Sequence, residues 1–156
     1  TPSGKIEFDS ARLRAEGHDG LPTYKEPYWS PAGSPEIAAD YPLVLSTGIR
    51  GKTYSHSQGR QLETLRVREP EPRAQINPED AAERGIQDGD RMEIASPLGR
   101  IEVTAWVTDA ILKGVVHAPH GWAEANCNAL IPDGEALDPI TGYPPFKSSL
   151  CQVTRA

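Results

Sequence analysis

The 156-residue sequence is poor in cysteine, in aromatic residues and in long apolar runs, and each shortage excludes a class of protein. Its two cysteines, Cys127 and Cys151, are too few for a disulfide framework and form no CxxC pair, so two reduced thiols are favoured over one disulfide. No apolar run approaches the roughly 18 residues that a membrane-spanning helix needs. An excess of basic residues is also lacking. The net charge of −6 argues against general binding to nucleic acid or to an anionic membrane.

Proline and glycine, in contrast, are frequent, with 15 and 14 copies, and this indicates a loop-rich globular domain dominated by β structure. The length suits one domain with a single core. Proline and glycine interrupt residues 1–40 so often that only Asp9 to Glu16 is compatible with a short helix. We therefore expect residues 1–40 to be an irregular connector from an upstream domain, and residues 41–156 to form the β domain.

Several short strands are predicted after residue 40. Residues 91–96 and 100–107 alternate apolar and polar side chains and are joined by a turn. Further candidates are Leu43–Ser46, Arg73–Ile76, Val115–Ala118 and Leu150–Val153. A short helix is predicted after Asn77, which is a good N-cap, with Pro78 at the first helical position and Gly85 at the exit. Many short strands with one small helix favour a closed β barrel.

The richest group of hydrogen-bond donors follows the first strand. The apolar run ends at Ser46-Thr47-Gly48, and a glycine turn of this kind lets an anion approach backbone N–H groups. The basic and hydroxyl residues that follow are Arg50, Lys52, Thr53, Ser55, His56 and Ser57. From residue 50 to residue 73, six basic residues outnumber three acidic ones, so this window is +3 and the rest is −9. Both a phosphate-binding loop and a solvated loop are compatible with that charge.

The sequence also contains residues suited to three other kinds of site. A nucleotide-hydrolysing P-loop would need Gly in place of Ser46 and an amphipathic helix after residue 53, and neither is present. A zinc site could use the ligand types of His117, His120, Cys127 and Cys151, but their spacing does not favour one. No nucleophile signature surrounds the cysteines or histidines. We therefore predict neither a catalytic residue nor a metal ligand.

Non-covalent capture of a large polar cofactor is the fourth kind of site. The amides of Asn126 and Asn128 can each pair with the donor and acceptor edge of a heterocycle, although asparagine is equally common in turns. Gly121 and Trp122 could give close approach and a flat apolar wall. Lys147 could add a positive charge late in the chain.

Several blocks, in this order along nearly the whole chain, resemble one known family. They are TPSGKIEF, YPLVLSTG, HSQ, INPEDAAERGIQDGD, SPLGRIEV, VTDAILKGVV, HGW with the two asparagines, and DPITGYPPFKSSLCQV. With these blocks the chain resembles the C-terminal molybdopterin dinucleotide-binding domain of molybdopterin oxidoreductases, the dimethyl sulfoxide reductase and formate dehydrogenase superfamily.

The resemblance implies a mainly β fold with short helices, a six-stranded double-psi β barrel like that of aspartate decarboxylase. It implies a bis(molybdopterin guanine dinucleotide) cofactor bearing molybdenum or tungsten. The positions that match the family's cofactor-binding residues are Thr47, Gly48, Arg50, His56, Ser57, Asn126 or Asn128, and Lys147. Ile49 separates Gly48 from the arginine here, which departs from the family's T-G-R loop.

The resemblance also implies what other parts of the enzyme supply. The metal-ligating residue and an iron–sulfur cluster belong to upstream domains, and an iron–sulfur electron-transfer subunit is an expected partner. We expect this chain alone to hold cofactor without redox turnover, in a prokaryote, with the cytoplasm favoured over the periplasm. The alternative is a stand-alone double-psi barrel that acts as an interaction or assembly module.

Overall fold

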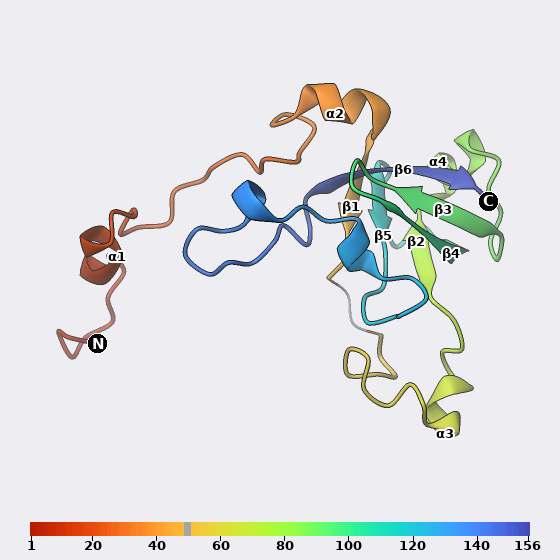
Figure 1. The fold of residues 1–156 in the computed structure, drawn as a ribbon, viewed down its shortest axis with the longest axis horizontal. Coiled ribbons are helices and arrows are strands. Elements are labelled where there is room, and N and C mark those ends of the chain that lie inside the picture. Colours follow the sequence, from red (N-terminus) through yellow and green to blue (C-terminus); the bar gives the residue numbers. More distant parts are fainter. Residues whose placement is uncertain (49–50) are drawn as a thin grey trace.

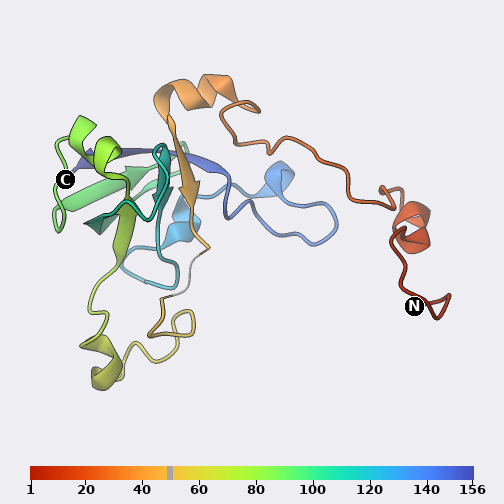
Figure 2. The same ribbon diagram turned by 180° about the vertical axis from the view of Figure 1, so that it is seen from behind.

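Six short strands form a barrel from which a long N-terminal arm extends, in a computed structural model that describes residues 1–48 and 51–156 (Figures 1 and 2). The strands are β1 (Leu43–Ser46), β2 (Arg73–Ile76), β3 (Arg91–Ala95), β4 (Arg100–Val107), β5 (Val115–His117) and β6 (Ser149–Arg155). The helices are α1 (Ala11–Ala15), α2 (Pro35–Asp40), α3 (Glu63–Arg66) and α4 (Pro78–Glu83), with the 3-10 turns η1 (Cys127–Ala129) and η2 (Gly134–Ala136). The mainly β architecture with short helices is confirmed.

The barrel is closed in the order β1-β5-β2-β4-β3-β6, and β6 returns to β1. The pairs β1–β5 and β2–β4 are parallel, and the other four pairs are antiparallel. Each strand therefore has two hydrogen-bonded neighbours. Closure removes the open edges that strands of only three to eight residues would otherwise expose.

The barrel has an internal two-fold relation. If β1 is exchanged with β4, β2 with β5 and β3 with β6, every strand pair becomes another pair of the barrel or itself. Parallel pairs stay parallel and antiparallel pairs stay antiparallel. The register follows the same rule, since Leu45 pairs with Val116 as Ala105 pairs with Ala74. Two interlocked halves, each crossing to the other through a parallel pair, are the arrangement of a double-psi β barrel. The predicted fold is thereby confirmed.

The interior of the barrel is filled by the alternate side chains of its strands. In β3, Met92 and Ile94 are fully buried, whereas Arg91 is exposed and Glu93 is half-buried. The largest fully buried apolar side chains are Leu45, Ile76, Met92, Ile94, Leu130, Leu150, Val103, Val116 and Val153. Each buried side chain of this size contributes about 1.5–3 kcal/mol to folding. The core therefore holds the strand ends, and the loops that leave them, in fixed relative positions.

The helices begin where their capping residues stand. α4 starts after Asn77, whose side-chain oxygen accepts a hydrogen bond of 3.0 Å from the Glu79 N–H, as predicted. In residues 1–40 the sequence predicts a helix only at Asp9 to Glu16. The structure has a second helix there, α2, so this prediction was wrong. Pro35 begins this helix, because a first-turn residue needs no N–H donor. The role of residues 1–40 as a connector stays a prediction.

Candidate functional site

Three segments of the chain meet at one end of the barrel. Because β1 and β5 are parallel and Ser46 pairs with His117, the segments that follow these strands start side by side. β6 is antiparallel to β1, and its pair Leu45–Ser149 brings the segment before β6 to the same end. In Figure 1 the segments after β1 and β5 both continue below the barrel. Residues far apart in the sequence are therefore neighbours here.

Thr47, Gly48 and Lys147 come together at this end. Thr47 is buried, its N–H donates to the Phe146 carbonyl at 2.7 Å, and its hydroxyl donates to the same oxygen at 3.3 Å. A Cβ added to Gly48 would lie 3.6 Å from Cε of Lys147. Thr47 thus holds the segment before β6 in place, and its hydroxyl is used within the protein. Gly48 and Lys147 remain exposed beside each other.

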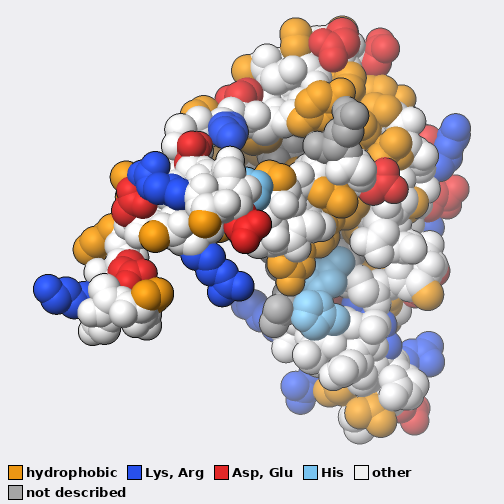
Figure 3. Space-filling model, turned by 60° about the vertical axis from the view of Figure 1, so that its left-hand side comes forward, with side chains coloured by type: hydrophobic (Ala, Val, Ile, Leu, Met, Phe, Trp, Pro, Cys, Tyr) orange, Lys and Arg blue, Asp and Glu red, His pale blue; other side chains and the backbone are white. Residues whose placement is uncertain are grey.

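His56 and Ser57 pack against the segment after β5. His56 has a φ of 56°, which is uncommon for a residue with a side chain. A Cβ on Gly121 would lie 2.8 Å from the His56 carbonyl carbon, so only glycine permits this approach. Nδ1 of His56 and Nε2 of His120 are 2.7 Å apart, and one of the two carries the shared proton. Histidine side chains are visible together on this surface (Figure 3).

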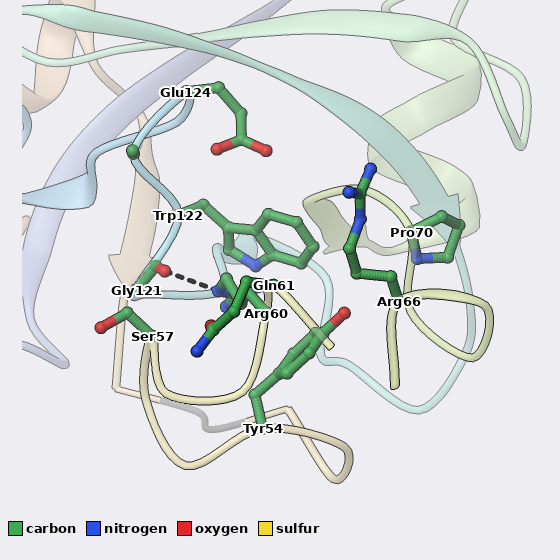
Figure 4. Close-up of a pocket in the computed structure, with 10 residues that line it drawn as sticks. Tyr54, Ser57, Arg60, Gln61, Arg66, Pro70, Gly121, Trp122 and Glu124 are labelled. Atoms are coloured by element: carbon green, nitrogen blue, oxygen red, sulfur yellow. Dashed lines mark hydrogen bonds between the residues drawn. The ribbon is translucent and has the colours of Figure 1, made fainter. Parts of the chain in front are cut away.

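Arg60 is the residue at this end that the sequence interpretation missed. Its guanidinium lies 3.4 Å from the ring centre of Trp122 and 4.3 Å from that of Tyr54, between the two loops (Figure 4). These side chains line a pocket of about 410 Å³ with Ser57 and Gly121. Nothing local in the sequence around Arg60 indicates this role, because its partners are about sixty residues away.

Buried nitrogen atoms without a protein partner gather around the same loops. Four of the five such nitrogens among the described residues lie here: Nε2 of His117, Nδ1 of His120, Nη1 of Arg60 and Nε1 of Trp122; the fifth, Nε of Arg84, lies at the C-terminus of α4. Burial, together with the neighbouring His120, lowers the pKa of His117 to about 4, so this imidazole is neutral at pH 7. Polar atoms left unpaired inside a protein are costly, so each of them calls for a reason, such as a bound water, an ion or a functional role.

Asn128 lies in η1 and Asn126 is its N-cap, beside the outer face of the β3–β4 hairpin. The side-chain oxygen of Asn126 accepts a hydrogen bond of 3.1 Å from the Asn128 N–H, so Asn126 caps this turn. Asn126 also lines a second pocket, of about 440 Å³, that shares Glu124 with the first. The turn-forming interpretation of Asn126 is therefore realised, and both amide groups are on exposed residues. Arg50, the remaining predicted residue, lies outside the described residues.

The described part of the chain, residues 1–48 and 51–156, offers no group of three or more His, Cys, Asp or Glu side chains that could hold a metal ion. Cys127 and Cys151 are free and buried, and burial raises the pKa of the Cys127 thiol to about 11. Within those same ranges, no helix has the length and apolarity to cross a membrane.

The structural class of this chain is thus a closed double-psi barrel with hydrogen-bond donors on the loops at one end. Residues 43–150 match the model of the family described as "Molydopterin dinucleotide binding domain", and this chain belongs to that family of molybdopterin dinucleotide-binding domains. The predicted family is confirmed.

Relatives agree with this assignment. The acetylene hydratase of Syntrophotalea acetylenica is 35% identical over 121 residues, which cover 78% of this chain. The dopamine dehydroxylase of Eggerthella lenta is 34% identical over an aligned length of 172 residues, which includes the whole of this chain. The solved acetylene hydratase from Pelobacter acetylenicus superposes on the whole chain with a TM-score of 0.91 and 29% identity, and 24% of that chain is covered. This chain spans only 17% of either curated relative.

Proposed function

We propose that this chain binds a bis(molybdopterin guanine dinucleotide) cofactor at the end of the barrel where β1 and β5 finish. The observation that supports it is the meeting of Gly48 and Lys147 with the loop of His56 and Ser57 at one barrel end. The buried imidazole nitrogens of His117 and His120, unpartnered among the described residues, fit a polar ligand at the same place.

Each proposed binding residue has a role that its chemistry allows. The exposed backbone at Gly48 and the ammonium group of Lys147 suit the diphosphate, because both offer donors to an anion. Thr47 supports this corner through its two hydrogen bonds to Phe146. We assign Arg50, His56 and Ser57 to the phosphate side of the ligand. Asn126 and Asn128 are assigned to a heterocycle, whose edge an amide can match.

We propose further that the chain is the C-terminal domain of a molybdenum or tungsten oxidoreductase. The redox chemistry is supplied by the bound cofactor, while the protein binds and orients it. The family assignment and the small share of each relative that this chain spans support a larger enzyme. Its other domains would carry the metal ligand and an iron–sulfur cluster, with an iron–sulfur subunit as electron partner. The stand-alone interaction module receives no support from the relatives.

The test uses the full-length protein, purified from a host that makes the cofactor. Metal content and the GMP released by acid are measured per polypeptide. We expect the double substitution Thr47→Leu with His56→Leu to lower both by about tenfold, because each lost polar contact is worth roughly 1 kcal/mol or more.

The matched control is Thr108→Leu with His18→Leu, which replaces the same residue types away from the three segments and should leave both contents unchanged. Equal cofactor content in the Thr47/His56 variant and in the wild type would reject the proposed site. A wild-type protein without metal or GMP would reject the proposed function itself.

A further inference from the structure

We infer that Arg60 is a positioning residue for the cofactor site, and that it holds the loop of His56 and Ser57 against the segment after β5. This inference rests on the function proposed above. It concerns a residue that does not itself need to touch the ligand. Its effect is carried by the backbone atoms that it joins.

The guanidinium of Arg60 contacts three backbone carbonyls in two loops. Its Nε donates to the Gly121 carbonyl at 2.7 Å. Its Nη2 donates to the carbonyls of His56 and His120, each at 3.3 Å. The segment after β1 is therefore linked to the segment after β5 by one side chain, directly beside the His56–His120 pair.

Stacking fixes the plane of this guanidinium. Its central carbon lies 3.4 Å from the ring centre of Trp122 and 4.3 Å from that of Tyr54. The two rings are perpendicular to each other, with centres 5.9 Å apart. Cation–π contacts of this kind are strongest when the cation is desolvated. Burial lowers the pKa of Arg60, and among the described residues no carboxylate forms an ion pair with it. The positive charge of Arg60 therefore interacts with backbone carbonyl oxygens and with aromatic rings.

The loop that Arg60 holds needs such support. The left-handed backbone of His56 is unfavourable for a residue with a Cβ and persists only where its surroundings impose it. The hydrogen bond from Arg60 to the His56 carbonyl, together with the close packing of Gly121, imposes it here. Lysine cannot replace this arrangement, because its ammonium lacks the planar fork and does not stack.

The experiment compares full-length wild type, Arg60→Lys and Arg60→Ala, each loaded with cofactor during expression. Cofactor release is followed after dilution, by metal and GMP remaining with the protein. Hydrogen–deuterium exchange is measured on peptides from 54–60 and 118–124. We expect both variants to release cofactor about tenfold faster, the effect of losing one charged hydrogen bond or more. Both peptides should exchange faster, while peptides of the barrel strands should not.

Arg73 provides the matched control. It also donates to a backbone carbonyl, that of Ala105, and lies 6.0 Å from the ring centre of Trp106. Arg73→Ala should release cofactor at the wild-type rate. Added methylguanidinium should slow release from Arg60→Ala and have no effect on Arg73→Ala. If Arg60→Ala does not accumulate, Arg60→Lys decides the release and exchange tests alone.

Three results would overturn the inference, and they are distinguishable. If Arg60→Lys retains cofactor as well as the wild type, within about twofold, the positioning role is refuted and the proposed function stands. A wild-type protein that carries no cofactor would remove both. Faster release that is matched by Arg73→Ala would also count against Arg60, because it would show a general loss of stability.

Discussion

Of the four histidines of the chain, His117 is buried, and it makes the free energy of unfolding depend on pH. Its pKa is about 4 in the folded protein against an ordinary value of 6.5. Between these values the unfolded chain binds more protons than the folded one, so stability falls as the pH drops from 6.5 towards 4. The loss is at most about 3 kcal/mol, since one pKa unit corresponds to about 1.4 kcal/mol.

We expect His117→Gln to flatten this dependence. Glutamine should fit, because Gln75 occupies the equivalent position in the other half of the barrel and pairs with His117 across the junction. Unfolding by urea at pH 7 and at pH 4.5 measures the difference. His18→Gln, on the N-terminal arm, is the control. A His117→Gln variant that loses as much stability on acidification as the wild type would contradict the assignment.

Part of the site could be predicted from single residues and their spacing. Local patterns and the family resemblance indicate Thr47, Gly48 and the late Lys147, and the barrel brings these residues together. Arg60 could not be found in this way. Its significance depends on Gly121 and on two aromatic rings, and only the parallel pairing of β1 with β5 places those loops against it.

At the scale of single elements, the N-cap of α4 also joins two parts of the chain. The amide nitrogen of Asn77 donates to the Ile111 carbonyl at 2.9 Å, while its oxygen caps the helix. We expect Asn77→Ala to lower the free energy of unfolding by about 1–2 kcal/mol, since both contacts are lost. Chemical denaturation measures this. Asn128→Ala should cost less than half as much, because Asn128 is exposed and, within the described part of the chain, only its backbone N–H forms a hydrogen bond. A neutral Asn77→Ala would refute the capping role.

Elements with a strong local signal were predicted with nearly their observed bounds. The alternating pattern of residues 100–107 and the capping residues of α4 are examples. The helices α2 and α3 were missed for physical reasons. Pro35 was interpreted as a helix breaker although it is favourable at a first helical position. α3 has only four residues, no side-chain cap and no buried face, so it carries no periodic signal.

For the whole molecule, we expect stability to reside in the barrel rather than in the arm. Leu45 is fully buried in β1, whereas Ile6 on the arm is 85% exposed. Leu45→Ala should lower the free energy of unfolding by about 2–5 kcal/mol, and Ile6→Ala by less than about 0.5 kcal/mol. Calorimetry or urea unfolding measures both. Similar effects of the two substitutions would contradict a core confined to the barrel.

No internal repeat is detectable in the sequence, yet the register shows that the two halves are equivalent. Residues 43–46 read LVLS where residues 103–106 read VTAW. The shared requirement is only that alternate side chains be apolar enough for the interior, which many sequences satisfy. The barrel was therefore predictable as a closed β structure from pattern, and its double-psi topology only through the family resemblance.

This equivalence separates what builds the barrel from what adapts it to a ligand. The connections that leave β1 and β5, residues 47–72 and 118–148, correspond in the other half to residues 108–114 and 77–90. Each connection at the proposed site is the longer of its pair, although the strands it joins are matched in register. Binding capacity in such a scaffold can thus be acquired by lengthening two connections at one pole, while the strand pairing and the shorter connections of the opposite pole are kept.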